Sequence, residues 1–330
     1  MTGTIGLVYD LRSEYLKEGY TLEQIAERDT EATIEALDAT LQALGHATDR
    51  IGHARALCAR LVRGDRWDLV FNIAEGLRGR SREAQAPAIL ELYGVPYVFS
   101  DPLVLAATLD KAVAKRLVRS HGLPTPNFKV VASLSEAVPD GLRFPLFAKP
   151  IAEGTGKGID ERSRIDGPEE LRAACARLLE AFGQQVLLEE YLPGREFTTA
   201  VIGTGRKARV IGTMEIEVLP AAARAIYSLE MKERCEEFVR YSAPPRDAVR
   251  RAVEDLALKS YLALECRDVG RVDIRLDADG APSFMEVNPL PGLHPQHSDL
   301  PMIATQEGMP FERLIAEIVE SARERARGAA

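Results

Sequence analysis

The chain has 330 residues, of which 46% are hydrophobic and 28% are charged. Because this length exceeds what one hydrophobic core usually serves, we expect a globular protein of two or three compact units. The formal net charge of −8 argues against nucleic acid or an anionic membrane as the main partner. The sequence contains no apolar run long enough to suggest a membrane span, and its four scattered cysteines are typical of reduced thiols. We therefore expect a cytoplasmic protein.

The first third of the chain alternates between strand-like and helix-like segments. Short apolar runs at 4–9, 67–73 and 95–99 predict strands, and apolar residues recur at helical spacing over 34–44. Alternation of this kind predicts an open, mainly parallel α/β sheet.

A lysine and a glycine-rich loop follow the strand predicted for 144–150. Lys149 ends this apolar strand, and a lysine there needs an anion or a carboxylate as its partner. Gly154, Gly156 and Gly158 stand at alternate positions, which opens backbone N–H groups to a phosphate. The spacing differs from that of the Walker A loop and of the dinucleotide fingerprint. The order strand, lysine and glycine-rich loop therefore predicts a phosphate-binding segment of another type.

Two strands joined by a turn at 278–280 carry side chains that suit a metal and an anion. Asp273, Glu286 and Asn288 offer oxygen ligands, and the last two share one face of a strand. Mg²⁺ prefers such oxygens together with substrate phosphates. With Arg271 beside them, these residues predict a metal–triphosphate site, although the hairpin alone could equally be a salt-bridged surface structure.

The segments Arg271-Val272-Asp273 and Glu286-Val287-Asn288-Pro289-Leu290-Pro291-Gly292 resemble the C-terminal signature of the ATP-grasp ligases, most closely the D-alanine–D-alanine ligase family. The resemblance covers most of the chain and departs in its N-terminal part. It implies an ATP-grasp fold, α+β in the ATP-binding part, behind an N-terminal open parallel α/β domain. We expect this N-terminal domain over 1–109, a central ATP-grasp subdomain over 110–195, and a C-terminal subdomain with the metal and substrate site over 196–330.

The resemblance implies that ATP and Mg²⁺, or Mn²⁺, drive amide formation between two amino acids through an acyl phosphate, and that the enzyme is a homodimer. It assigns Arg271 and the backbone N–H of Gly292 to the oxyanion, and Asp273, Glu286 and Asn288 to the metal. Lysines and the glycine-rich loop meet the phosphates, the segment 189–192 meets adenine, and Glu196 meets ribose. The residues that the match assigns to ATP are Lys111, Lys149, Gly154, Thr155, Gly156, Gly158, Glu189, Glu190, Tyr191, Leu192, Glu196, Lys232 and Phe284.

Three residues match positions that hold the two substrates in the family. Glu14 is the candidate for the amino group of the first substrate, though a solvated loop carboxylate is the simpler interpretation. Thr155 takes the place of a substrate-side serine, and Ser298 is the candidate for the terminal carboxylate of the second substrate. The family's His-Gly is replaced by Ala74-Glu75-Gly76, and the tyrosine that follows its loop lysine is replaced by Glu233.

These departures leave three hypotheses open. The protein is a strict D-alanine–D-alanine ligase, a related ligase for another amino-acid pair, or a non-catalytic ATP-binding regulatory protein. Glu75, Arg78 and Arg80 could read a different substrate or be solvated. A zinc pair at His294 and His297 is disfavoured because Pro295 interrupts a helical spacing and no thiol is near in sequence.

Overall fold

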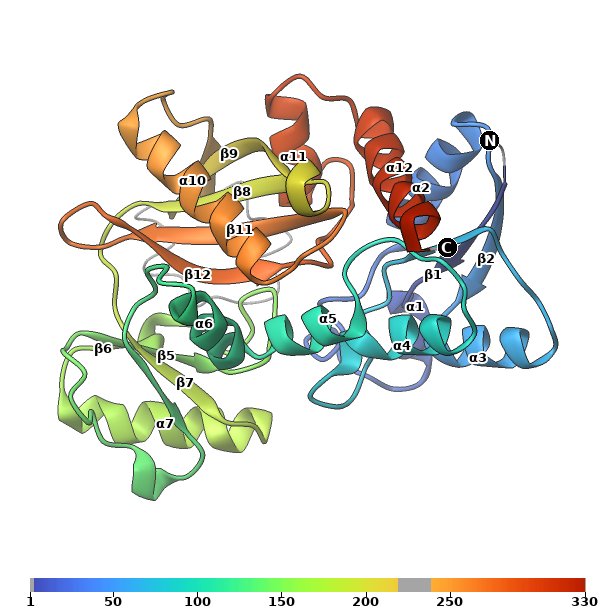
Figure 1. Ribbon diagram of the computed structural model, residues 1–330. Coiled ribbons are helices and arrows are strands. Elements are labelled where there is room, and N and C mark those ends of the chain that lie inside the picture. Colours follow the sequence, from blue (N-terminus) through green and yellow to red (C-terminus); the bar gives the residue numbers. More distant parts are fainter. Residues whose placement is uncertain (1–2, 219–238, 330) are drawn as a thin grey trace.

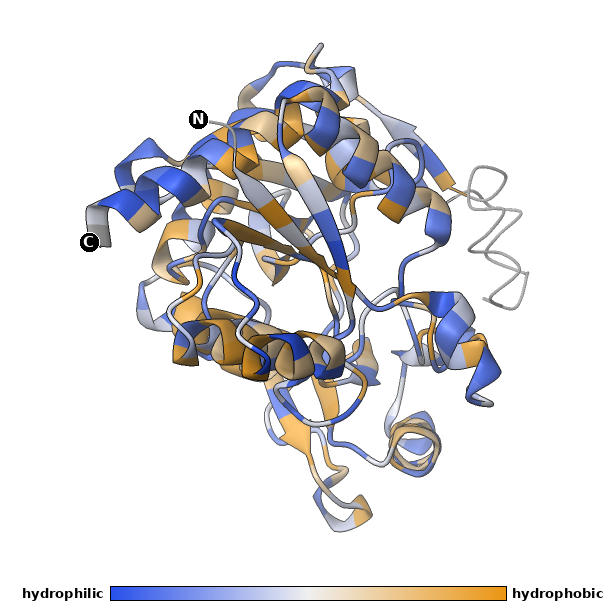
Figure 2. Ribbon diagram, turned by 90° about the vertical axis from the view of Figure 1, so that its right-hand side faces the viewer, coloured by the Kyte–Doolittle hydropathy of each residue, from blue (hydrophilic) through white to orange (hydrophobic). Residues whose placement is uncertain are grey.

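The structure is a computed structural model that describes residues 3–218 and 239–329. Lys232, which the resemblance assigns to ATP, and Glu233, which replaces the family's tyrosine, fall outside the described residues. Three sheets with helices packed on them make up the molecule (Figure 1). In Figure 2, hydrophobic residues are frequent along the inner strands, and the helices carry both hydrophobic and hydrophilic residues.

The N-terminal sheet is parallel, as predicted. Its order is β2 (Ala47–Gly52), β1 (Thr4–Val8) and β3 (Leu69–Asn72). The sequence pattern missed β2 because most of its residues are exposed or half-buried. The strand predicted at 95–99 forms only one bridge, from Tyr97 to Val70. Phe99 has a φ of 74°, in the left-handed region, so the extended run stops there.

Helices cover this sheet and lead out of it. The polar composition of the segment 10–20 predicts a loop, but the segment contains a short helix, α1 (Arg12–Lys17), so this prediction is wrong. The N-terminal helices after it are α2 (Glu31–Ala43), α3 (Ala54–Val62), α4 (Gln85–Leu92), α5 (Pro102–Leu109) and α6 (Lys111–Ser120). Single 3₁₀ turns occupy Arg82–Ala84, Leu134–Glu136, Glu161–Ser163 and Gly205–Lys207.

A four-stranded antiparallel sheet follows, with α7 (Pro168–Phe182) packed on it (Figure 1). Leu171, Cys175 and Leu178 recur at helical spacing in the sequence, which predicts a helix here. The structure confirms it, and these residues and Ala174 form the buried face of α7. The strand order is β4 (Phe128–Val131), β7 (Val186–Glu190), β5 (Leu146–Pro150) and β6 (Arg164–Ile165).

The third sheet is antiparallel and has α10 (Ala248–Ala263) packed against it. The sequence over 219–243 predicts a long irregular segment, but its described part contains a strand, β10. The strand order is β10 (Val239–Ser242), β9 (Arg209–Val218), β8 (Glu196–Ile202), β11 (Val269–Leu276) and β12 (Pro282–Asn288).

The C-terminal helices join the third sheet to the N-terminal part. α11 (Asp299–Gln306) packs on β9, and α12 (Phe311–Ala329) lies beside α2 (Figure 1). Ile315 and Ile318 of α12 share one hydrophobic cluster with Ile34 and Leu37 of α2. None of the helices in the described part of the chain is long and apolar enough to cross a membrane.

Candidate active site

The β11–β12 hairpin brings together four predicted residues. Asp273 lies opposite Glu286 in the strand register, and Arg271 lies opposite Asn288. Arg271 donates from Nε and Nη2 to the two oxygens of Asp273, at 3.1 and 3.0 Å. Thr198 of β8 also donates to Asp273, at 2.8 Å. The carboxylate is therefore fixed from the neighbouring strand as well as from its own.

Lys111 places a cation beside this hairpin. The carboxylate of Asp110 caps α6 by accepting from the N–H groups of Ala112 and Val113, so Lys111 stands at the first turn. Its Nζ lies 3.3 Å from Glu286 Oε2 and donates to the carbonyl of Glu153, at 2.5 Å. Burial alone would raise the pKa of Glu286, but Lys111, Lys149 and Arg271 outweigh it and lower this pKa to about 2.

Lys149 pairs with a carboxylate, as its position at the end of an apolar strand predicted, and this carboxylate belongs to Glu189. The Nζ of Lys149 lies 2.8 Å from one oxygen of Glu189, and the Nζ of Lys115 lies 2.9 Å from the other. Burial would raise the pKa of Glu189, but the two lysines outweigh it and lower it. The side chain predicted to meet adenine is therefore held by two cations, and Lys115 was missed. Its sequence signal is the spacing of four from Lys111, which puts both on one helix face.

Tyr191, also in the predicted adenine segment, is surrounded by three side chains from other segments, and we call this group the Tyr191 cradle. Its ring stacks on Phe147 with centroids 6.3 Å apart, and the guanidinium groups of Arg164 and Arg275 lie 5.0 and 5.2 Å from the ring. Arg275 also pairs with Glu196, at 3.2 Å. Flat rings beside guanidinium planes suit the binding of another aromatic ring.

Three other residues predicted to meet ATP, two from this segment and Phe284 from β12, are paired or buried within the protein. The carboxylate of Glu190 pairs with the exposed Arg143, and Leu192 is largely buried. Phe284 is fully buried, and its carbonyl accepts from Thr125 and Lys115.

Close approach explains two glycines of the phosphate loop. A Cβ at Gly154 would lie 2.7 Å from Glu27 Oε1, and one at Gly158 would lie 2.7 Å from Pro150 and from Phe182. Thr155, between them in sequence, has a φ of 49°, so this loop is bent through the left-handed region.

A carboxylate that the sequence did not single out meets this loop. Glu27 accepts from the N–H of Gly154 at 2.6 Å and pairs with Arg82 and Lys157, at 3.1 and 3.3 Å. Burial would raise the pKa of Glu27, but Arg82, Lys157 and Arg28 lower it to about 2. Glu14, the predicted residue, is instead exposed on α1. The sequence signal for Glu27 was its place beside Arg28, just after the turn formed by Thr21 and Gln24. In that turn, the side chain of each of these two residues accepts from the backbone N–H of the other.

The residues predicted to bind the second substrate also lie near Arg271. Its Nη1 donates to Asp299 Oδ2 at 2.5 Å, and Asp299 opens α11 directly after Ser298. A Cβ at Gly292 would lie 2.8 Å from Ser298 Oγ, so these two predicted residues are in close contact. Burial would lower the pKa of Arg271, but Asp273 and Asp299 outweigh it and raise it. Asp299 was missed, and no motif in the sequence signals its pairing with Arg271.

The two histidines lie between Gly292 and Ser298 in the chain. The rings of His294 and His297 are 4.6 Å apart, and the N–H of His294 donates to Ser298 Oγ at 3.0 Å. Within residues 3–218 and 239–329, no three His, Cys, Asp or Glu side chains form a group suited to a metal ion. The histidine pair therefore lacks further ligands of these types there.

The hairpin suits a hard divalent cation. It offers two carboxylates and one amide, which are oxygen donors of the kind that Mg²⁺ prefers. Burial raises the pKa of Asp273, Arg271 lowers it, and repulsion from Glu286 raises it further, with a net increase. A cation between the two carboxylates would relieve this repulsion, so the residues present fit a metal.

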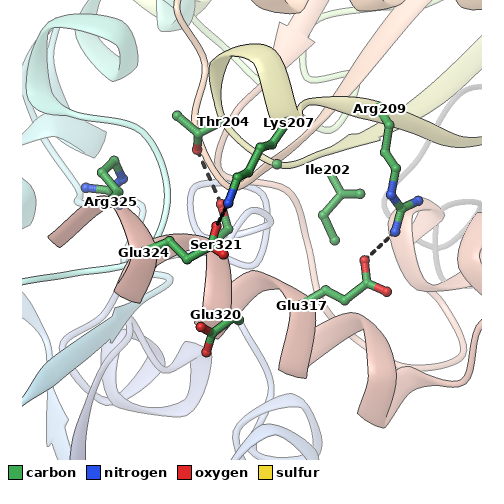
Figure 3. Close-up of a pocket in the computed structure, with 10 residues that line it drawn as sticks. Ile202, Thr204, Lys207, Arg209, Glu317, Glu320, Ser321, Glu324 and Arg325 are labelled. Atoms are coloured by element: carbon green, nitrogen blue, oxygen red, sulfur yellow. Dashed lines mark hydrogen bonds and ion pairs between the residues drawn. The ribbon is translucent and has the colours of Figure 1, made fainter. Parts of the chain in front are cut away.

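A separate cavity of about 450 Å³ lies between the β8–β9 connection and α12 (Figure 3). Its charges pair with one another, Lys207 with Glu324 and Arg209 with Glu317. It contains none of the predicted site residues, and its charges are already satisfied.

Comparisons with known proteins show the family of the chain. The family described as "D-ala D-ala ligase C-terminus" matches residues 117–320. The chain belongs to this family. A D-alanine–D-alanine ligase of Bordetella petrii is 37% identical over 260 residues, 78% of this chain and 76% of the relative. An uncharacterized protein of Sinorhizobium fredii, y4sG, is 33% identical over 264 residues, 78% of this chain and 75% of the relative.

A solved D-alanine–D-alanine ligase of Bacillus anthracis, complexed with ATP, matches the whole of both chains with a TM-score of 0.77 at 21% identity. At that identity it shows the fold alone, which is the predicted ATP-grasp fold. By its family the protein is an enzyme, an ATP-dependent carboxylate–amine ligase of the D-alanine–D-alanine ligase type that uses ATP and a divalent metal. The non-catalytic hypothesis is not favoured.

Proposed function

We propose that the protein joins the carboxylate of one amino acid to the amine of another, with ATP as the energy source and Mg²⁺, or Mn²⁺, as the metal. The observation that carries this proposal is the convergence of Arg271, two opposed carboxylates and Lys111 at one end of the β11–β12 hairpin. The names of the relatives support amino-acid substrates. We also propose a cytoplasmic homodimer, on the resemblance and composition alone.

In the first step, the carboxylate of one amino acid attacks the γ-phosphate of ATP, which gives an acyl phosphate and ADP. Phosphoryl transfer needs charge neutralisation more than covalent help. Lys111 and Lys149 supply fixed positive charge, and Lys232, outside the described residues, is proposed to join them. A bound Mg²⁺ would be held by Asp273, Glu286 and Asn288 and would supply neutralisation and a template for the phosphates. The Tyr191 cradle and Glu196 are proposed to hold adenosine.

In the second step, the amine attacks the acyl carbon and phosphate leaves. The oxyanion that forms needs donors aimed at it. Arg271 has five N–H groups in a fixed fork, and three of its nitrogens each use one on Asp273 or Asp299. One N–H on each terminal nitrogen remains for the oxyanion, together with the N–H of Gly292. The two carboxylates therefore orient Arg271 without exhausting it.

The contacts of Ser298, Thr155 and Glu14 differ in how far they support a role in binding substrate. Ser298 lies beside Gly292 and Arg271, which supports a contact with the second substrate. Thr155 is on the phosphate loop, where the first substrate would enter. Glu14 is exposed on α1, whereas Glu27 touches the loop, so Glu27 is the better candidate to face the first substrate. A strict D-alanine–D-alanine ligase remains the second candidate because several curated relatives carry that name.

The test is ADP formation from ATP and Mg²⁺ with a panel of D- and L-amino acids, singly and in pairs, with products identified by mass. The proposal expects turnover that depends on an acid and an amine, and a dipeptide mass. A D-alanyl-D-alanine mass from D-alanine alone would select the strict ligase. ATP turnover without any coupled product would refute the proposal.

A further inference from the structure

A cavity of about 1240 Å³ lies beside the phosphate loop. Its walls are formed by segments at 20–28 and 77–82 of the N-terminal part, the loop at 151–160, and the end of α7. Ligand cavities usually measure roughly 300–1000 Å³. This space is therefore ample for a substrate larger than alanine.

The cavity is positively charged in a negatively charged protein. Seven arginines and lysines line it, against four glutamates and aspartates, when the described residues are counted. The whole chain carries a formal charge of −8. A cleft that concentrates charge of one sign raises the local concentration of ligands of the opposite sign.

The acidic residues of the wall neutralise it only in part. Glu27 is shared by Arg28, Arg82 and Lys157, at 3.2, 3.1 and 3.3 Å. Lys157 also pairs with Glu153, and Asp160 is shared by Arg162 and Arg177. Behind Arg82, burial raises the pKa of Glu75 well above its ordinary range and that of Glu83 to about 7, which weakens the negative charge of both.

One of these arginines is buried with an unused donor. The side chain of Arg28 is 2% exposed, and its Nε has no hydrogen-bond partner among the described residues. A buried donor without a partner costs stability, so such a group calls for an acceptor.

Arg78 is the most available cation of the cavity. It is exposed, and its guanidinium donates to the hydroxyl of Tyr20 at 3.1 Å. In the portion of the chain that the structure describes, Arg78 pairs with no carboxylate. Arg80, by contrast, is held by Asp110 at 2.6 Å. Arg78 can therefore turn toward a ligand without breaking an ion pair there.

The cavity adjoins the proposed reaction site. Glu153 lines it, and the carbonyl of this residue accepts from Lys111 Nζ. Lys111 in turn pairs with Glu286 of the hairpin. A molecule whose reacting carboxylate lies near Lys111 could thus extend into the cavity toward Arg78.

We propose that this cavity binds a second, non-reacting anionic group of the acid substrate, so that the first substrate is a dicarboxylic or phosphorylated amino acid. The inference rests on the proposed ligase function and names its substrate class. The anionic group forms charge-assisted hydrogen bonds with Arg78 and with the donors around Arg28.

The test compares acids that match in size and differ in charge. Glutamate is set against glutamine, aspartate against asparagine, and phosphoserine against serine, in both chiralities, with ATP, Mg²⁺ and a panel of amines. We expect kcat/KM to favour the charged member of at least one pair by about tenfold or more. Arg78→Ala should lower this preference about tenfold, mainly through KM, and Arg78→Lys should restore part of it. Arg63→Ala, an exposed arginine outside the cavity, is the matched control.

Equal use of charged and neutral members by the wild type would overturn the inference, even if ligation itself is observed. If no pair supports turnover, calorimetry with glutamate, aspartate, phosphoserine and inorganic phosphate decides the cavity independently of the proposed function. Tighter binding of one of these amino acids to the wild type than to Arg78→Ala supports the anionic subsite. Binding of inorganic phosphate alone assigns the cavity to a free anion and overturns the substrate assignment, as does equal binding to both variants.

Discussion

The buried cluster of Lys115, Glu189 and Lys149 allows a prediction about the stability of the folded protein. Glu189 is 1% exposed and lies 2.9 and 2.8 Å from the two ammonium groups. The change Glu189→Gln keeps the shape of the side chain and removes its charge. Two buried ammonium groups would then face each other across a neutral amide.

The magnitude follows from the contacts. At an effective dielectric constant of about 20, each contact near 2.9 Å contributes about 6 kcal/mol of attraction. Desolvation of the charges offsets much of this, and removing one member of a buried pair costs about 3–5 kcal/mol. We therefore expect Glu189→Gln to lower the free energy of unfolding by about 3–5 kcal/mol, a large share of the ~5–15 kcal/mol that holds a typical domain.

The neighbouring residue supplies the control. Glu190 pairs with Arg143, whose side chain is 83% exposed, so Glu190→Gln should cost less than about 1 kcal/mol. The assay is urea unfolding of both variants and the wild type at pH 7.5, without ATP. If Glu189→Gln and Glu190→Gln unfold within about 1 kcal/mol of each other, the reasoning about the buried cluster is wrong.

Three further predictions concern the hairpin and a buried carboxylate. Arg271→Ala should lower kcat about 10²–10³-fold, as the loss of an oxyanion donor does, with unchanged circular dichroism; near-normal turnover would contradict its role. Asp273→Asn should raise the Mg²⁺ concentration needed for half-maximal turnover, and chelation of the metal should abolish turnover of the wild type; an unchanged requirement would contradict the metal assignment. Burial raises the pKa of Glu83 to about 7 from 4.5, against the opposing charge of Arg82. The folded state then holds a proton that the unfolded state releases between these values, so stability should fall as pH rises from about 4.5 to 7. Glu83→Gln should flatten this limb in urea unfolding, and an unaltered slope would refute the shift.

Local patterns were sufficient to predict much of the fold. The β11–β12 hairpin was predictable because its turn and its strand residues are adjacent in sequence. The same holds for α7, whose apolar spacing is uninterrupted between Pro168 and Gly183. β2 escaped prediction because its polar residues lie at an exposed position of the sheet, where burial imposes no alternation.

The site was predictable only where its residues lie in a motif. The pairing of Lys115 with Glu189 joins residues 74 positions apart, and that of Arg271 with Asp299 joins residues 28 apart. Tertiary packing alone brings these charges together, and no periodicity encodes it. Glu14 was chosen because it matches the family's glutamate in the loop after the first strand, whereas the contact of Glu27 with the phosphate loop depends on how the segment after α1 folds back.

The measurement that tests the central claim most directly is oxygen transfer from the acid substrate to phosphate. The acid that supports turnover is prepared with both carboxylate oxygens as ¹⁸O, and the phosphate released with ADP is analysed by mass. Activation through an acyl phosphate predicts that each phosphate carries one ¹⁸O atom and that the amide retains the other. Unlabelled phosphate, formed at the same rate as the coupled product, would contradict carboxylate attack on ATP and the account built on it.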